Sequence, residues 1–138
     1  MRADEFDKLI AEGYEKLPQW VRDKIKNVAL LSEDEPSGEI RRKERLGKTT
    51  TLLGYYHGMP LAARGDFYGV GATLPDTITL YRLPILDVAE QSLPPGATVE
   101  QFSERVREIV ADTVWHEFAH HFGMSEKEVR LREKKRKH

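Results

Sequence analysis

Apolar side chains spaced three to four positions apart predict helices at the start of the chain. In residues 3–16 this spacing is regular and charged residues fill the other positions, which is typical of an amphipathic helix. Pro18 begins a new segment, and the pattern that follows it predicts a second short helix around residues 20–25. The size of Trp20 and its apolar neighbours favour a core position for that side chain.

Other stretches have the composition of strands. Residues 27–31 form a short apolar run that predicts a buried strand, and residues 49–56 are rich in β-branched and aromatic residues. Residues 77–83 alternate apolar and polar side chains, which is typical of a half-buried strand. The polar residues 32–47 are expected to form a loop or a weak edge strand. The glycine-rich residues 61–75 are a candidate edge strand for binding an extended peptide, with a flexible connector as the alternative.

A long helix is expected from Val99 to about residue 122. Thr98 followed by Gln101 has the pattern of a capping box at its start. The first half of this helix is amphipathic, whereas the second half is apolar nearly all round, so that half is expected to be buried. A short helix is also predicted at 85–92, after Pro84 ends the preceding strand.

Length and composition are those of an ordinary soluble domain. The 138 residues, of which 33% are charged and 39% hydrophobic, predict one domain spanning 1–138, with a basic tail at about 130–138. The net charge of −1 gives no general attraction to nucleic acid. The absence of cysteine excludes disulfides and thiolate metal ligands. Because no leader-like or membrane-spanning apolar run is present, a cytoplasmic protein without a membrane partner is expected.

The sequence H-E-x-x-H, at residues 116–120, is the strongest chemical signal in the chain. On a helix, His116 and His120 lie on one face, about 40° apart around the axis, where both imidazoles can bind one Zn²⁺ ion. Glu117 can reach a water molecule on that ion and act as a general base without binding the metal. A pair of hydrogen-bonded core histidines is the alternative. His121 is about 140° away from His116 and is not expected to share its metal.

A third protein ligand is expected shortly after the helix. Gly123 suits the end of the helix, and Glu126 follows His116 by ten positions, the spacing at which metzincin-type enzymes place a histidine or aspartate ligand. Glu126 is therefore the first candidate and Glu128 the second. Ser125 with Glu128 also has the pattern of a capping box, in which Glu126 is an ordinary first-turn acid of a final helix over residues 126–135.

Three motifs resemble a family of small bacterial zincin-like proteins that have been described as possible zinc metallopeptidases. They are LGYYHGMPL at 53–61, LPDTITLYR at 74–82 and HEFAHHFGMSE at 116–126, and together they span most of the chain. The resemblance implies an α+β, minimal zincin-like fold, in which a small mixed sheet packs on N-terminal helices and a central H-E-x-x-H helix. It also implies His116 and His120 as ligands, Glu117 as base and an acidic ligand at Glu126.

These observations predict a zinc metallopeptidase that acts on a peptide or protein substrate. The alternative is a metal-bound module that binds peptides or proteins with little turnover. A zinc-dependent ribonuclease is disfavoured because the chain lacks a broad basic surface, so nucleic acid is an unlikely partner. His57 is expected in a turn, with stabilisation of an oxyanion as its alternative role. Tyr81 is expected to pack in the core, with a position facing the metal as the alternative.

Overall fold

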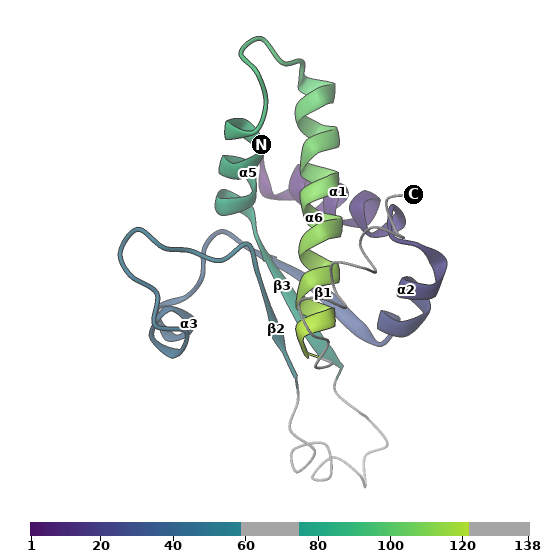
Figure 1. Ribbon diagram of the computed structural model, residues 1–138, viewed down its shortest axis with the longest axis vertical. Coiled ribbons are helices and arrows are strands. Elements are labelled where there is room, and N and C mark those ends of the chain that lie inside the picture. The colour runs from purple at the N-terminus through teal and green to yellow at the C-terminus, as the bar shows by residue number, and fades with distance from the viewer. Residues whose placement is uncertain (59–74, 122–138) are drawn as a thin grey trace, which may run out of the picture.

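The computed structural model describes residues 1–58 and 75–121 (Figure 1). The helices of this part are α1 (Ala3–Glu15), α2 (Gln19–Ile25), α3 (Gly38–Lys43), α5 (Arg82–Gln91) and α6 (Val99–His121). The strands are β1 (Val28–Glu33), β2 (Gly54–His57) and β3 (Asp76–Tyr81). The α+β class predicted from the sequence is confirmed, and none of the helices in the described ranges is long and apolar enough to cross a membrane.

The three strands form one mixed sheet with the order β1-β3-β2. β3 is central: it runs parallel to β1 and antiparallel to β2. Ile78 and Leu80 of β3 are completely buried, as their alternation with threonine predicted. β2 is the antiparallel outer strand of this sheet, so its far side is not paired with another strand in the part of the chain that the structure describes.

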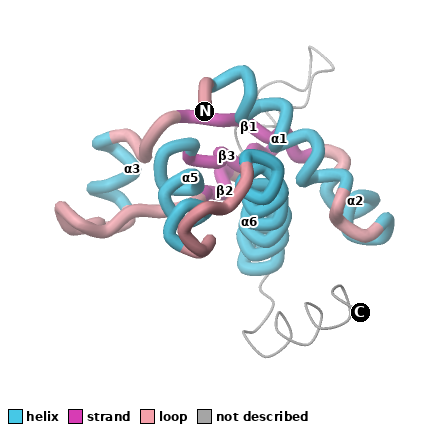
Figure 2. The backbone as a smooth tube through the Cα atoms, turned by 90° about the horizontal axis from the view of Figure 1, so that it is seen from above, coloured by secondary structure: helices cyan, strands magenta, loops and turns pink. Residues whose placement is uncertain are grey.

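Helix α6 is the central element of the molecule. It crosses the sheet and contacts β2 and β3, and it also packs against α1 and α5 (Figure 1). Seen along its axis, α5 lies on one side of α6 and α1 on the other, while α3 stands apart (Figure 2). Val106, Val110 and Val114 are fully buried on α6, and Trp115 joins them in the core. The predicted capping box is present: Gln101 N–H donates to Thr98 Oγ1 at 3.1 Å, and Thr98 N–H donates to Gln101 Oε1 at 2.8 Å.

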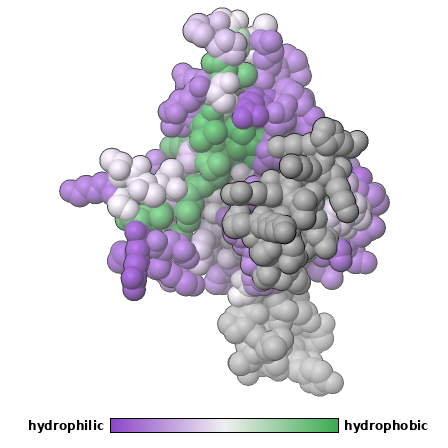
Figure 3. All heavy atoms as spheres, in the orientation of Figure 1, coloured by the Kyte–Doolittle hydropathy of each residue, from purple (hydrophilic) through white to green (hydrophobic). Residues whose placement is uncertain are grey.

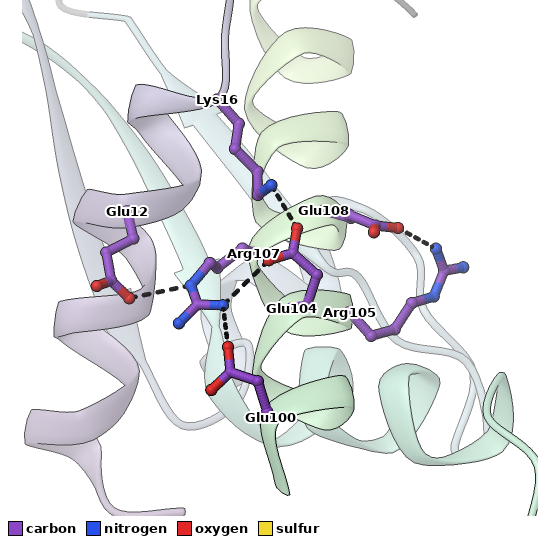
Figure 4. A network of polar contacts seen from close by, with 7 residues as sticks. All are labelled: Glu12, Lys16, Glu100, Glu104, Arg105, Arg107 and Glu108. Atoms are coloured by element: carbon purple, nitrogen blue, oxygen red, sulfur yellow. Dashed lines mark hydrogen bonds and ion pairs between the residues drawn. The ribbon is translucent and has the colours of Figure 1, made fainter. Parts of the chain in front are cut away.

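Glycine and an ion-pair network fix α1 against α6. A Cβ atom on Gly13 would lie 2.8 Å from the Arg107 carbonyl oxygen and 2.9 Å from Val110 Cγ1, so this crossing requires glycine. Beside it, Arg107 bridges Glu12 of α1 and Glu104 of its own helix at 3.0 and 3.1 Å (Figure 4). It also pairs with Glu100 at 3.4 Å. Because one arginine serves three carboxylates, the entropy of ordering its side chain is lost once for three ion pairs.

Several predictions about local structure were wrong. Residues 38–43 form the short helix α3, which Ser37 caps by accepting a bond from Ile40 N–H at 3.2 Å, rather than a loop or an edge strand. β2 covers only the last part of the predicted strand 49–56. β3 ends at Tyr81, before Pro84, because α5 already begins at Arg82 and proline is tolerated in a first helical turn.

Trp20 also departs from its predicted core position. Its side chain is 38% exposed, although the ring packs edge-on against Trp115 with 5.6 Å between the ring centroids. Trp20 therefore covers the core instead of filling it.

Candidate metal centre

The two histidines of the H-E-x-x-H sequence face each other at the C-terminal end of α6. The ring centroids of His116 and His120 are 5.9 Å apart, and the ring planes are nearly perpendicular, at 86°. Two imidazoles that share a tetrahedral zinc ion with Zn–N distances of ~2.0–2.1 Å have their centroids about 5 Å apart. The observed separation is within about an ångström of that value, which is compatible with both rings binding one ion.

Glu117 lies between these histidines in the sequence, and a backbone group of the sheet holds its side chain. Burial raises the pKa of its carboxyl group, which is only partly offset by the charge of His120 and by a hydrogen bond from the backbone N–H of Tyr56. The nearby charge of Glu44 raises the pKa further. A half-buried carboxylate that is oriented by one backbone donor and has an elevated proton affinity has the properties of a general base.

Tyr56 of β2 makes three contacts, two of which join the sheet to the end of α6. Its backbone N–H donates to Glu117, and its ring stacks on His121 with centroids 3.8 Å apart and planes 14° from parallel. Its hydroxyl donates to Asp76 of β3 at 2.7 Å. These contacts fix the orientation of the helix end relative to the edge strand. They also place His121 against β2, while His120 faces His116.

The degree of burial at this end of α6 differs from the prediction. His116 and Glu117 are half-buried, and His120 and His121 are exposed, although Phe118 and Ala119 on the opposite face are buried. The helix therefore presents its polar face to solvent and only its apolar face to the core. This correction suits a hydrolytic site, since a substrate and water must reach the residues that act on them.

The predicted third ligand cannot be placed, because Glu126 and its alternative Glu128 lie outside the described residues, as do Gly123 and the basic tail. Within residues 1–58 and 75–121, no group of three or more histidine, aspartate or glutamate side chains is arranged to hold a metal ion. Of the three expected ligands, the described part of the chain contains His116 and His120. The candidate peptide-binding stretch 61–75 falls almost entirely outside the described ranges too.

The two further candidates lie at different depths. Tyr81 is in the core, with 1% of its surface exposed, and burial together with the charges of Glu33, Tyr55 and Glu117 raises its pKa to about 12. It is thus a packing residue, as expected. His57 is exposed at the end of β2 rather than in a turn.

Two residues near the histidines were not singled out from the sequence. Tyr56 was noted only within a motif, and the groups that matter are a backbone donor and a ring whose partner is 65 positions away, so no local pattern identifies them. Asp112 lines a pocket beside His116 and Glu117. Its spacing of four residues before His116 is a signal that would have placed it on the same helix face.

Comparison with known proteins identifies a family over most of the chain. Residues 25–136 match the sequence model of a family described as zincin-like metallopeptidase. The match includes β1, the whole sheet and the H-E-x-x-H sequence. No curated protein matches the chain significantly.

Proposed function

Because the chain belongs to the zincin-like metallopeptidase family, we propose that it hydrolyses peptide bonds at a zinc site at the end of α6. One observation carries this proposal: the His116 and His120 rings face each other one helical turn apart, with the half-buried Glu117 between them in sequence. His116 and His120 are the proposed histidine ligands, and Glu126 is the proposed third ligand. Zinc held there supplies a Lewis acid that polarises the scissile carbonyl and makes a water molecule acidic near neutral pH.

Glu117 is the proposed general base. Its carboxylate takes the proton of the attacking water and returns it to the amine that leaves. The half-burial of Glu117 and the backbone donor from Tyr56 support this role, because they hold the carboxylate in one place next to the proposed ligands. The Tyr56 N–H keeps one carboxylate oxygen fixed while the other is available to the water.

The outer strand β2 supports a peptide as the substrate. Tyr81 N–H donates to the Leu53 carbonyl at 2.9 Å, so the alternation of an antiparallel pair directs the backbone groups of Tyr55 toward β3 and those of Gly54 and Tyr56 outward. The outward Tyr56 N–H is the one that holds Glu117. An extended peptide that pairs with the remaining outward groups would therefore lie beside the proposed base.

Glu117→Gln is the decisive substitution. The amide keeps the shape of the side chain but cannot accept the proton, so we expect the variant to bind zinc as the wild type does and to cleave peptides about 10²–10⁴-fold more slowly. Zinc content is measured by mass spectrometry and cleavage with a mixed peptide library. Glu90→Gln, which changes an exposed carboxylate on α5, is the matched control and should keep full activity.

The results separate hydrolysis from binding alone. Equal cleavage by wild type and Glu117→Gln would overturn the assignment of the base. Retention of library peptides by the zinc-loaded wild type without any cleavage would instead favour the alternative, a metal-bound peptide-binding module.

A further inference from the structure

Three residues of α6 that are spaced four positions apart all contact strand β2. Thr113, Glu117 and His121 follow one another by one helical turn, so they form a stripe along one face of the helix. At about 100° per residue, this stripe lies about 80° around the helix axis from His116 and His120. The helix thus has one side for the proposed ligands and another for the strand, and Glu117 belongs to the side that faces the strand.

The first of these contacts requires a glycine in the strand. A Cβ atom on Gly54 would lie 2.7 Å from Thr113 Cγ2 and 3.2 Å from the Thr79 carbonyl oxygen, so the absence of a side chain lets the helix approach the strand. The Thr113 hydroxyl donates to the Ile109 carbonyl at 2.7 Å, which fixes the side chain with its methyl group toward Gly54. The methyl group therefore fits into space that any other residue at position 54 would fill.

The second contact lies about two helical turns further along, at the end of α6. The His121 ring stacks on the Tyr56 ring with the centroids 3.8 Å apart. Gly54 and Tyr56 are two positions apart in β2, so both belong to the same face of the sheet. Glu117 lies between the two contacts and accepts a hydrogen bond from the Tyr56 backbone N–H. The proposed base is therefore held between one contact on each side of it along the helix.

The first contact also forms part of a pocket beside the candidate metal centre. The pocket has a volume of about 320 Å³, and Gly54 and Thr113 line it together with His116 and Glu117. Figure 3 shows that apolar surface runs over α5 and down toward the segment before β2. The strand that would pair with a substrate and the helix that carries the base thus meet at this pocket. A change in their spacing would change the distance from the substrate to Glu117.

We propose that Thr113 and His121 are positioning residues, which dock α6 on β2 and thereby fix Glu117 at the strand edge where a substrate would bind. The inference rests on the proposed peptidase function and specifies how the base and the substrate strand are brought together. Neither residue is a proposed ligand, so zinc binding should not depend on them. A displacement of about 1 Å at a reacting centre lowers the rate by up to about 10²-fold, which is the size of effect that loss of either contact can have.

Hydrogen exchange at the Tyr56 amide, followed by NMR in the metal-free full-length protein, reports the position of Glu117 without substrate or turnover. This N–H points away from β3 and bonds to Glu117, so it should exchange faster when the carboxylate moves away. We expect His121→Ala to speed its exchange by about tenfold, toward the rate in Glu117→Ala. The Tyr55 N–H, which is directed toward β3, is the internal control and should keep its rate. His121→Phe keeps a ring that can stack and should keep the wild-type rate at both amides.

Gly54→Ala tests the other contact. It should also speed exchange at the Tyr56 amide and slow peptide cleavage by about 10–10²-fold, while the zinc content stays that of the wild type. Adding Thr113→Ser removes the methyl group nearest to the new Cβ and keeps the hydroxyl, so the double variant should recover most of both properties. Gly47→Ala is the matched control and should behave as the wild type, because a Cβ there would meet only Thr50 Oγ1, at an ordinary 3.8 Å.

The outcomes separate this inference from the proposed function. Unchanged exchange at the Tyr56 amide in His121→Ala would overturn the inference whatever the protein cleaves, and this exposed residue can be replaced even if Gly54→Ala does not fold. Equal acceleration at Tyr55 and Tyr56 would also overturn it, since the strand itself would then be opening. Acceleration at Tyr56 alone, reversed by Thr113→Ser in Gly54→Ala and absent in His121→Phe, would support the positioning contacts. In a protein that cleaves no peptide, the same result would support them and refute the peptidase.

Discussion

Two adjacent histidines at the end of α6 face different partners, and this difference makes the proposed ligand set testable residue by residue. His120 faces His116 across 5.9 Å, whereas His121 stacks on Tyr56 at 3.8 Å. We expect His120→Ala to lose the zinc that remains on wild type after dialysis, about one ion per chain. His121→Ala should retain it. Zinc and protein are measured together by mass spectrometry and amino-acid analysis, and equal zinc loss in both variants would contradict the assignment.

Tyr81 should make the free energy of unfolding decrease as the pH rises through the alkaline range. Burial raises its pKa from 10.0 to about 12, so between these values the folded protein holds a proton that the unfolded chain releases. The contribution of Tyr81 to the free energy of unfolding is therefore complete below pH 10. It is lost as the pH rises toward 12, and it amounts to about 2–3 kcal/mol for a shift of this size. Tyr81→Phe should remove that part of the slope. Urea unfolding of both proteins at several pH values measures it; parallel curves would contradict the prediction.

Site residues that are related by the repeat of the α-helix could be predicted from the sequence. Residues that act through contacts between distant parts of the chain could not. His116 and His120 follow from the repeat of the α-helix, since four positions always return to the same face. Their ring centroids lie 5.9 Å apart, as expected of two side chains on one helix face. The donor from Tyr56 to Glu117 joins positions 61 apart through the backbone, and no property of a tyrosine side chain encodes it.

At the scale of elements, the crossing of α1 over α6 depends on one glycine. A methyl group at Gly13 would meet the Arg107 carbonyl oxygen at 2.8 Å, and a backbone atom cannot turn aside as a flexible side chain can. We expect Gly13→Ala to destabilise the fold by about 1–3 kcal/mol in spite of the better helix propensity of alanine. Chemical denaturation measures the change.

Gly38 of α3 is the matched control for this substitution. The nearest atom to a Cβ there is the mobile Arg42 Nη1 at 3.3 Å, so Gly38→Ala should change stability by less than about 0.5 kcal/mol. If the two alanine variants were equally stable, close packing of α1 on α6 would not be what limits position 13.

The helices that could be predicted well from the sequence are those with a long run of regularly spaced apolar residues or a strict capping motif. The thirteen residues of α1 and the capping box at Thr98 are local signals, and both are present. β2 was predicted too long because Thr49–Leu53 have strand propensity but form a loop, where Arg41 donates to the Thr50 carbonyl at 2.8 Å. Strand propensity depends on pairing with a neighbour, and the register with β3 begins at Gly54, one residue after the Leu53 carbonyl that accepts the Tyr81 N–H.

At the scale of the whole molecule, the core and the candidate metal centre occupy different faces of α6. Its middle, including Val106 and Val110, is buried with Phe6 of α1, while His120 near its end is exposed. Apolar burial supplies most of the stability of a small domain, and here that burial involves neither histidine. The fold should therefore exist before the metal binds, unlike that of a zinc finger.

Removal of the metal is the test of this separation. After treatment with a chelator, we expect the protein to keep its helical circular dichroism and a single cooperative unfolding transition. Added zinc at about 100 times its dissociation constant should then stabilise the fold by about 2.7 kcal/mol through binding to the folded state alone. His116→Ala is the matched control: it should unfold at the temperature of the metal-free wild type and show no rise when zinc is added. Complete loss of helical signal on chelation would mean instead that the ion is part of the core architecture, and that the half of α6 packed on α1 cannot hold the fold without it.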